Sequence, residues 1–357
     1  MSALYLKRRL LLVLLGVWNA EVVSMGTFFY EFAHPSNIFV TFMYYALHFL
    51  IIEDLYSRFK LTYRDLLLIG IIFGLLEEGV LTLTFYMPVT EWLKAGYGRF
   101  FGINTVWATF LTFFHAVYTI TLTFMIVDRF FPRSFTPFLN KKTYVPVIAY
   151  LLVLYSGNPL HVVSVVLPSQ LHFNFKPRLE ALLIVASLIV ILTLITVRRV
   201  RRTLNFKNEA AAHPPPPSRR LLVSDATIVL LMSALWWIPY MYSYEGFPEL
   251  LALVYVLALA TLFPSVFTWY VKRKGGLSEK RIMVVTASII SFYVSLSAYC
   301  YFLSHDYISV VVVLITLILE LEIALKRPVL INFLSLVGRK AASVVKKEAR
   351  PLEESQD

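Results

Sequence analysis

Ten apolar stretches of about 20 residues each run through this chain of 357 residues, and they restrict it to very few folds. A helix needs about 20 apolar residues to cross the hydrocarbon core of a bilayer. Inside that core every backbone N–H and C=O must bond within the protein, which leaves helices and closed barrels. We therefore predict an all-α, polytopic integral membrane helix bundle. The ten stretches cover approximately residues 10–30, 36–55, 65–86, 103–127, 143–158, 179–197, 221–243, 249–271, 282–303 and 307–325.

Positive charge lies between these stretches in an alternating pattern that indicates topology. The chain carries 33 Lys and Arg against 22 Asp and Glu, a net charge of +11. With the N-terminus inside, the predicted inner segments hold 29 of those 33 cations, as expected for positive cytoplasmic loops. We predict ten transmembrane helices, cytoplasmic N- and C-termini, and a location in the cell membrane. The cations are expected to meet the lipid bilayer and its anionic lipid rather than nucleic acid.

A basic, proline-rich segment at 198–220 is the predicted domain boundary. It contains four consecutive prolines, Pro214–Pro217, which exclude a regular helix and favour a stiff spacer. We expect a cytoplasmic linker here, between a six-span membrane domain, 1–197, and a four-span membrane domain, 221–326. Residues 327–357 are predicted to form a basic cytoplasmic tail that meets anionic lipid. The oligomeric state stays open.

Polar residues inside three of the stretches are the strongest functional signal. Glu77 and Glu78 lie halfway along the third stretch, and His115 lies halfway along the fourth. Asn19 and Glu21 flank the middle of the first. A charged carboxylate at this depth costs roughly 2.5–3.5 kcal/mol, so such groups usually face the bundle interior and serve a function. Because the three positions have similar depth, we predict a single polar cluster.

Spacing along two of the stretches predicts which side chains meet. Gly70, Gly74 and Glu78 recur every four residues and share one helix face, and small residues let a neighbouring helix approach closely. The fourth stretch carries a polar stripe that includes His115, and the short connection makes the two helices antiparallel neighbours. We therefore expect Glu78 to face His115. The stripe also contains Asn104 and Thr112.

A buried carboxylate pair beside a histidine is suited to the activation of water. The pair accepts a proton from water as a general base, while His115 orients that water or stabilises an oxyanion. Two histidines and a carboxylate also form a usable metal set, but no His-Glu-x-x-His spacing occurs. The metal is therefore left unknown, and no cofactor is required. The candidate catalytic residues are Glu77, Glu78, His115 and His161, and a proton relay or supporting role is expected for Asn19, Glu21, Asn104 and Thr112.

Each polar group also has a purely structural interpretation. The buried pair and its histidine would then be hydrogen-bonded packing residues with no chemistry. Glu53 and Asp54, close to Arg58, are expected to form an ion pair at the inner end of the second stretch. Glu320 and Glu322 are expected to be charges at the end of a helix.

The order of acidic pair, histidine and later histidine resembles the CAAX prenyl protease and bacteriocin-processing group of intramembrane proteases. Over about residues 66–165, Glu77 and Glu78 match the acidic pair, His115 the first histidine and His161 the second. The resemblance implies a protease in which a glutamate and histidines activate water within the membrane. Three positions depart from the family pattern and are occupied by Thr82, Leu111 and Val165.

Three hypotheses follow for the function. The first is a glutamate-type intramembrane hydrolase or protease, which requires Glu78 and His115 to lie within water-bridging distance. The second is a proton- or cation-coupled transporter or permease that uses the buried carboxylates as a relay. The third is a non-catalytic membrane scaffold in which the polar groups satisfy one another.

Segment Tyr97–Asn104 is also similar to a group of uncharacterised prokaryotic membrane proteins, which implies no activity.

Overall fold

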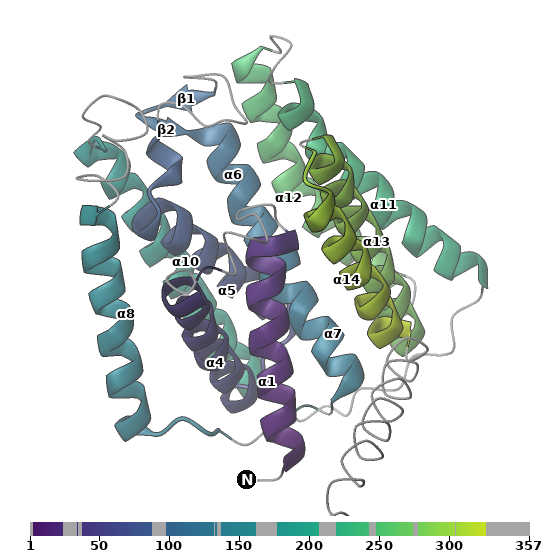
Figure 1. The fold of residues 1–357 in the computed structure, drawn as a ribbon, viewed down its shortest axis with the longest axis horizontal. Helices are drawn as coiled ribbons and strands as arrows, with labels where there is room; N and C mark the ends of the chain where they lie inside the picture. The colour runs from purple at the N-terminus through teal and green to yellow at the C-terminus, as the bar shows by residue number, and fades with distance from the viewer. Residues whose placement is uncertain are drawn as a thin grey trace, which may run out of the picture.

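The structure, a computed structural model, is a bundle of helices (Figure 1). It describes residues 3–23, 34, 38–87, 98–131, 133, 137–161, 177–206, 219–242, 248–273, 278–303 and 305–325. The proline-rich part of the predicted linker and the whole predicted tail lie outside these ranges. The expected contacts of both segments with anionic lipid stay predictions.

Long α-helices supply nearly all of the described secondary structure. They are α1 (Ala3–Trp18), α4 (Met43–Arg58), α5 (Tyr63–Leu76), α6 (Thr105–Phe114), α7 (Thr123–Phe130), α8 (Lys141–His161), α10 (Leu179–Phe206), α11 (Arg219–Tyr242), α12 (Glu249–Arg273), α13 (Glu279–Leu303) and α14 (Tyr307–Leu325). Shorter π-helical segments continue several of them, namely η1 (Asn19–Val23), η2 (Ile38–Phe42), η3 (Glu77–Leu81) and η5 (His115–Leu122). A 3₁₀ turn, η4 (Thr84–Tyr86), precedes a two-stranded antiparallel hairpin, β1 (Arg99–Phe100) and β2 (Ile103–Asn104).

The described helices fall on the predicted apolar stretches, which confirms the all-α class. Two described stretches are long and apolar enough to cross a membrane by themselves. Thr105–Phe130 is mostly buried in the bundle, whereas Leu179–Arg201 is mostly exposed. The total of ten spans therefore stays a prediction.

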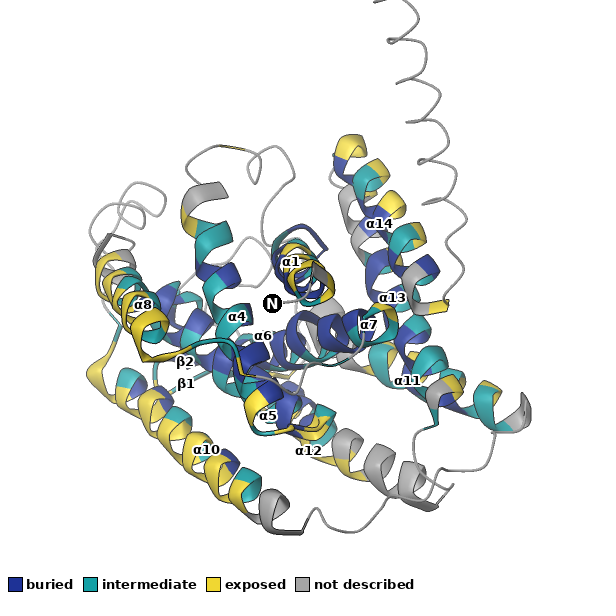
Figure 2. Cartoon of the chain, turned by 90° about the horizontal axis from the view of Figure 1, so that it is seen from below, coloured by how far each residue is buried: buried dark blue, intermediate teal, exposed yellow. Residues whose placement is uncertain are grey.

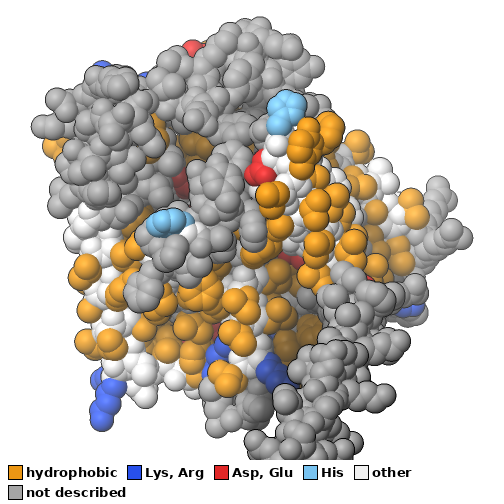
Figure 3. All heavy atoms as spheres, in the orientation of Figure 1, with side chains coloured by type: hydrophobic (Ala, Val, Ile, Leu, Met, Phe, Trp, Pro, Cys, Tyr) orange, Lys and Arg blue, Asp and Glu red, His pale blue; other side chains and the backbone are white. Residues whose placement is uncertain are grey.

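The outer helices present apolar side chains outward. On α10 the exposed residues include Leu183, Leu188 and Ile191. Figure 2 shows α8 and α10 at the edge of the bundle with their outer sides exposed, and Figure 3 shows apolar side chains spread over one face. A surface of this kind is unfavourable in water and suits contact with lipid chains.

The central stretch, which runs through α6, η5 and α7, is mostly buried in the bundle, and its α6 and η5 parts contact α5. A Cβ atom added to Gly70 would lie 2.6 Å from Ala116 Cα, and one added to Gly74 would lie 2.9 Å from Thr112 Cα. No real Cβ tolerates such distances, so the two backbones meet because glycine stands at both positions. The predicted close approach of these two stretches is confirmed.

Residues from both sides of the predicted linker share one hydrophobic core. Phe114 and Tyr118 of the central stretch pack in the same cluster as Val285, Tyr293 and Val294 of α13. The rings of Tyr118 and Tyr293 are 4.9 Å apart between centroids. Helices α11, α13 and α14 therefore pack against the part of the bundle that carries the polar cluster.

Ion pairs join the ends of several helices on one side of the bundle. Arg8 of α1 is fully buried and lies 2.8 Å from Glu53 Oε1 on α4 and 2.8 Å from Asp128 Oδ1 on α7. Asp54 pairs with Arg58, at 2.9 Å, as expected, and this hydrogen bond raises the pKa of the Arg58 guanidinium. The partner of Glu53 is Arg8 rather than Arg58, because α1 packs along α4 and brings its basic end over that carboxylate.

Glu320 and Glu322 lie near the described end of α14, as expected, but both are buried. Their side chains are 1% and 9% exposed, so neither is a solvated charge at a helix end. Helix α14 packs against α7 and η1, and the two residues are buried within the bundle.

Candidate functional site

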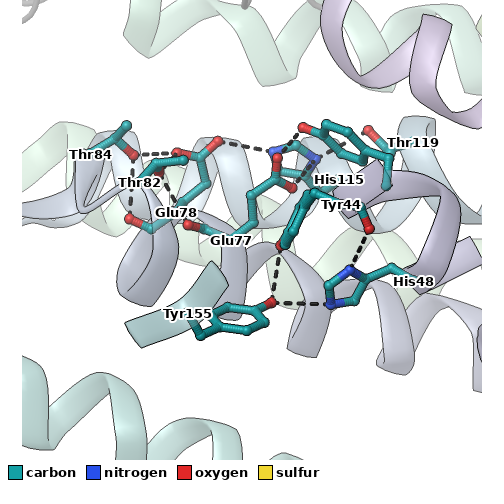
Figure 4. Close-up of polar contacts among 10 residues, drawn as sticks. Tyr44, His48, Glu77, Glu78, Thr82, Thr84, His115, Thr119 and Tyr155 are labelled. Atoms are coloured by element: carbon teal, nitrogen blue, oxygen red, sulfur yellow. Dashed lines mark hydrogen bonds and ion pairs between the residues drawn. The ribbon is translucent and has the colours of Figure 1, made fainter. Parts of the chain in front are cut away.

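Glu77, Glu78 and His115 come together in the interior of the bundle (Figure 4). His115 Nε2 lies 3.0 Å from Glu78 Oε1, and His115 Nδ1 lies 3.4 Å from Glu77 Oε2. All three side chains are buried, with at most 9% of each residue exposed. The prediction that Glu78 faces His115 is confirmed, and its cause is the glycine contact that holds α5 against η5.

Each of these three side chains also contacts a hydroxyl group through one of its polar atoms. Tyr45 of α4 donates a hydrogen bond to Glu77 Oε1. Thr84 and Thr82 both donate to Glu78 Oε2, the latter at 3.1 Å. Tyr45 reaches the Glu pair from a different helix, whereas Thr82 and Thr84 follow Glu78 closely along the chain.

Thr119 provides the matching contact on the histidine. Its Oγ1 lies 3.2 Å from His115 Nδ1, one turn further along the same helix. Thr119 shares the polar stripe of the central stretch, so the sequence carries a signal for this partner. No such periodic signal marks Tyr45 or Thr84.

The helices change to π-helical geometry at the polar residues. Segment η3 begins at Glu77, η5 begins at His115, and η1 contains Asn19 and Glu21. A π turn inserts an extra residue into an α-helix and is frequently found at functional sites. In this chain three such turns coincide with the three groups that were predicted to form one cluster.

A second hydrogen-bond network lies beside the first. His48 Nδ1 is 2.8 Å from the carbonyl oxygen of Tyr44, and His48 Nε2 is 3.1 Å from the Tyr155 hydroxyl. A carbonyl only accepts, so Nδ1 carries the proton and Nε2 accepts from Tyr155. The Tyr155 oxygen in turn accepts from the Tyr44 hydroxyl at 3.0 Å. Phe73 touches both networks, with its ring 5.2 Å from that of His48 and 5.8 Å from that of His115.

The predicted supporting residues have different surroundings. Asn19 is fully buried and donates to Thr123 Oγ1 at 3.2 Å. Glu21 is half-buried, and its charge acts on Tyr45, Glu77 and His115.

Two further predicted residues have structural contacts. Asn104 caps the N-terminus of α6, where its side chain accepts a hydrogen bond from the Trp107 backbone at 3.4 Å. Thr112 is buried where the central stretch meets Gly74. His161 is the last residue of α8, and its side chain lies outside the part of the chain that the structure describes.

The three central residues offer one nitrogen and two carboxylate oxygens that all lie within 4.8 Å of one another. Such a group is able to share protons, to bind a cation or to activate water. Its burial among apolar helices strengthens every electrostatic interaction within it.

Comparisons with known proteins give a family and no activity. A family model described as an uncharacterized membrane protein family matches residues 10–346. Searches of curated proteins and of solved structures return no match. The resemblance to the CAAX prenyl protease group receives no support from these comparisons. Because the match covers nearly the whole chain, this protein belongs to that uncharacterized membrane protein family.

Proposed function

We propose that the protein is an intramembrane hydrolase whose reactive centre consists of Glu77, Glu78 and His115. The contact between Glu78 Oε1 and His115 Nε2, at 3.0 Å inside the bundle, is the observation that carries the proposal. A carboxylate and an imidazole in contact are the two groups that general acid–base catalysis of hydrolysis needs. The substrate class that we propose is an acyl bond, in a peptide or a lipid ester, that enters from the membrane.

The proposed roles follow from the contacts of each group. Glu78 takes a proton from water, whose oxygen attacks the carbonyl carbon, and His115 gives a proton to the leaving atom as the acyl bond breaks. Glu77 and Thr119 both face His115 Nδ1 and orient the imidazole. The supporting hydroxyls of Tyr45 and Thr84 keep the two carboxylates in place.

A direct test compares the full chain with site variants in liposomes. The probes are quenched fluorescent peptides and fluorogenic acyl esters that partition into the bilayer. We expect Glu78→Gln and His115→Ala to lower the hydrolysis rate by roughly 10²–10⁴-fold, the contribution of a positioned acid or base. The exposed His305 gives a matched control, since His305→Ala should keep the rate. Equal rates in Glu78→Gln and the parent chain would exclude the proposed mechanism.

A cation-coupled transporter is the second candidate, favoured by the interrupted helices η1, η3 and η5. Transporters place ion sites where helices are broken near the middle of the membrane. Under this hypothesis Glu21 belongs to the relay, because its charge reaches both Glu77 and His115. Proton uptake into liposomes, followed with a trapped pH-sensitive dye, should then be lost in Glu21→Gln. An unchanged flux in that variant removes this candidate.

A purely structural role accounts less well for the group. If the three side chains only satisfied one another, each buried polar atom should have a hydrogen-bond partner. Among the described residues, Glu77 Oε2 accepts no hydrogen bond. An acceptor left in this state favours a site that takes a further ligand.

A further inference from the structure

We propose that Glu77, Glu78 and His115 together bind one divalent transition-metal ion, with Zn²⁺ as the representative case. The inference deepens the proposed hydrolase and rests on it only for the chemical consequence. We infer the binding itself from the contacts of the three side chains. In each of them one polar atom contacts a hydroxyl group and another faces the centre of the group (Figure 4).

Each of the three side chains has one atom held from outside and one atom facing the others. Glu77 is held at Oε1 by Tyr45, and its Oε2 accepts no hydrogen bond. Glu78 is held at Oε2 by Thr82 and Thr84, and its Oε1 faces His115.

The histidine follows the same pattern. Thr119 Oγ1 lies 3.2 Å from His115 Nδ1, and Nε2 faces Glu78. Metal ligands in proteins are oriented in this way, because hydrogen bonds to their outer atoms fix the tautomer and the direction of the donor atom.

The distances suit ligands of a common ion. Metal–ligand bonds of about 2.0–2.2 Å place neighbouring donor atoms about 3 Å apart. His115 Nε2 and Glu78 Oε1 are 3.0 Å apart, and all three residues offer a donor atom within 4.8 Å of the others. Glu77 Oε2 lies 3.4 Å from Nδ1 of the same ring, so this carboxylate has to turn toward Nε2 to complete the set.

Charge balance favours a divalent ion over a single proton. In the tautomer whose Nδ1 donates to Thr119, the lone pair of His115 Nε2 faces a carboxylate oxygen, and a cation between the two atoms removes their repulsion. One proton there leaves a net negative charge at the group when both glutamates are ionised. A divalent cation balances both carboxylates with a neutral imidazole, which avoids an unpaired charge in the interior.

The ligand set also indicates the chemistry of the ion. One imidazole and two carboxylates suit Zn²⁺ and related first-row ions, and three protein ligands leave a position open for water. A metal ion held there would lower the pKa of a bound water to about 7 and so supply hydroxide for attack on an acyl carbon. Glu78 and His115 would then serve as ligands instead of as base and acid. The proton lost by the water would pass to solvent, and the leaving group would take a proton from solvent as the acyl bond breaks.

The test measures metal content and affinity with the full chain purified without a histidine tag. After treatment with a chelator, the protein is titrated with ZnCl₂ by calorimetry, and bound zinc is counted by mass spectrometry. We expect one zinc per chain. The variants Glu77→Gln, Glu78→Gln and His115→Ala should each bind at least tenfold more weakly.

Controls separate metal binding from folding. His305→Ala changes an exposed histidine and Glu320→Gln a buried carboxylate on α14, and both should bind zinc as the parent chain does. Tyr45→Phe keeps all three ligands and removes only the hydroxyl that holds Glu77, so its affinity should fall by roughly 10–100-fold. Circular dichroism and gel filtration verify that each variant is folded.

The outcomes for the metal and for the hydrolase are distinguishable. A folded parent chain that takes up no stoichiometric zinc, or ligand variants that bind as tightly as the parent, overturns the metal site. Zinc binding without hydrolysis of any probe supports the metal site and counts against the proposed function. Hydrolysis that persists in fully zinc-free protein counts against a role of the metal in the reaction and supports the general-base mechanism.

Discussion

At the scale of single residues, Glu320 is a buried carboxylate that lies outside the candidate site. Neither of its carboxylate oxygens has a hydrogen-bond partner of normal geometry among the described residues. The Asn19 amide and the Tyr118 hydroxyl lie close enough to interact electrostatically with it. A buried polar group in this state costs about 1–3 kcal/mol of stability.

Replacing this carboxylate with an apolar side chain should stabilise the fold. We expect Glu320→Leu to raise the free energy of unfolding by about 1–3 kcal/mol, the desolvation cost that the leucine avoids. Thermal unfolding in detergent, followed by tryptophan fluorescence, measures the change. The exposed Glu249 is the matched control, and Glu249→Leu should give no increase. A clear loss of stability in Glu320→Leu would indicate instead that the carboxylate binds a partner.

At the scale of elements, the contact between α5 and the central stretch should be sensitive to a single methyl group. Gly70→Ala places a Cβ 2.6 Å from the backbone of Ala116, so the two helices must move apart. We expect a loss of about 1–3 kcal/mol, the usual cost of overpacking, together with weaker activity or zinc binding. Gly157→Ala on α8, where nothing lies within 4 Å, should be neutral or stabilising. Equal effects of the two changes would contradict the role of the glycine contact.

The ion pair that joins α11 to α13 allows a second prediction at this scale. Arg281 Nε and Nη2 donate to Asp225 at 2.7 and 2.8 Å, and both side chains are at most 1% exposed. Arg281→Ala leaves a buried carboxylate without this partner and should cost about 3–5 kcal/mol. The pair Asp54 and Arg58 is the comparison, because Arg58 is partly exposed and Arg58→Ala should cost about 1 kcal/mol or less. Denaturant unfolding of the parent chain and the two variants measures both costs.

The packing of the elements also explains which contacts could be predicted from the sequence. The facing of Glu78 and His115 was predictable because glycines four residues apart mark one helix face and the neighbouring stretch is joined by a short connection. Tyr45 and Arg8 were not predictable as partners, since their contacts depend on how α4 and α1 pack against distant helices. The burial of Glu320 was not predictable for a similar reason, because it depends on how α14 packs against α7 and η1.

At the scale of the whole molecule, the prediction of ten spans is testable through the single Cys300. In a cysteine-free chain, Cys300→Ser, the substitution Ala95→Cys lies in a predicted outer segment and Ala210→Cys in the predicted inner linker. An impermeant maleimide should label Ala95→Cys in right-side-out vesicles, and Ala210→Cys only after the membrane is opened. The same labelling of both positions in closed vesicles would show that the span count between them is wrong.

The π-helical turns have a consequence for the history of this chain. A π turn is an α-helix with one surplus residue, so η3 and η5 mark two points where the chain is one residue longer than an uninterrupted helix requires. An extra residue that stayed in α-helical geometry would rotate everything beyond it by about 100°, and the π turn absorbs this rotation. Deleting one residue from η5 would restore an α-helix, and the apolar length of the stretch would barely change. An ordinary membrane helix and one that carries this cluster are thus separated by a single insertion, a short evolutionary step that leaves the span itself intact.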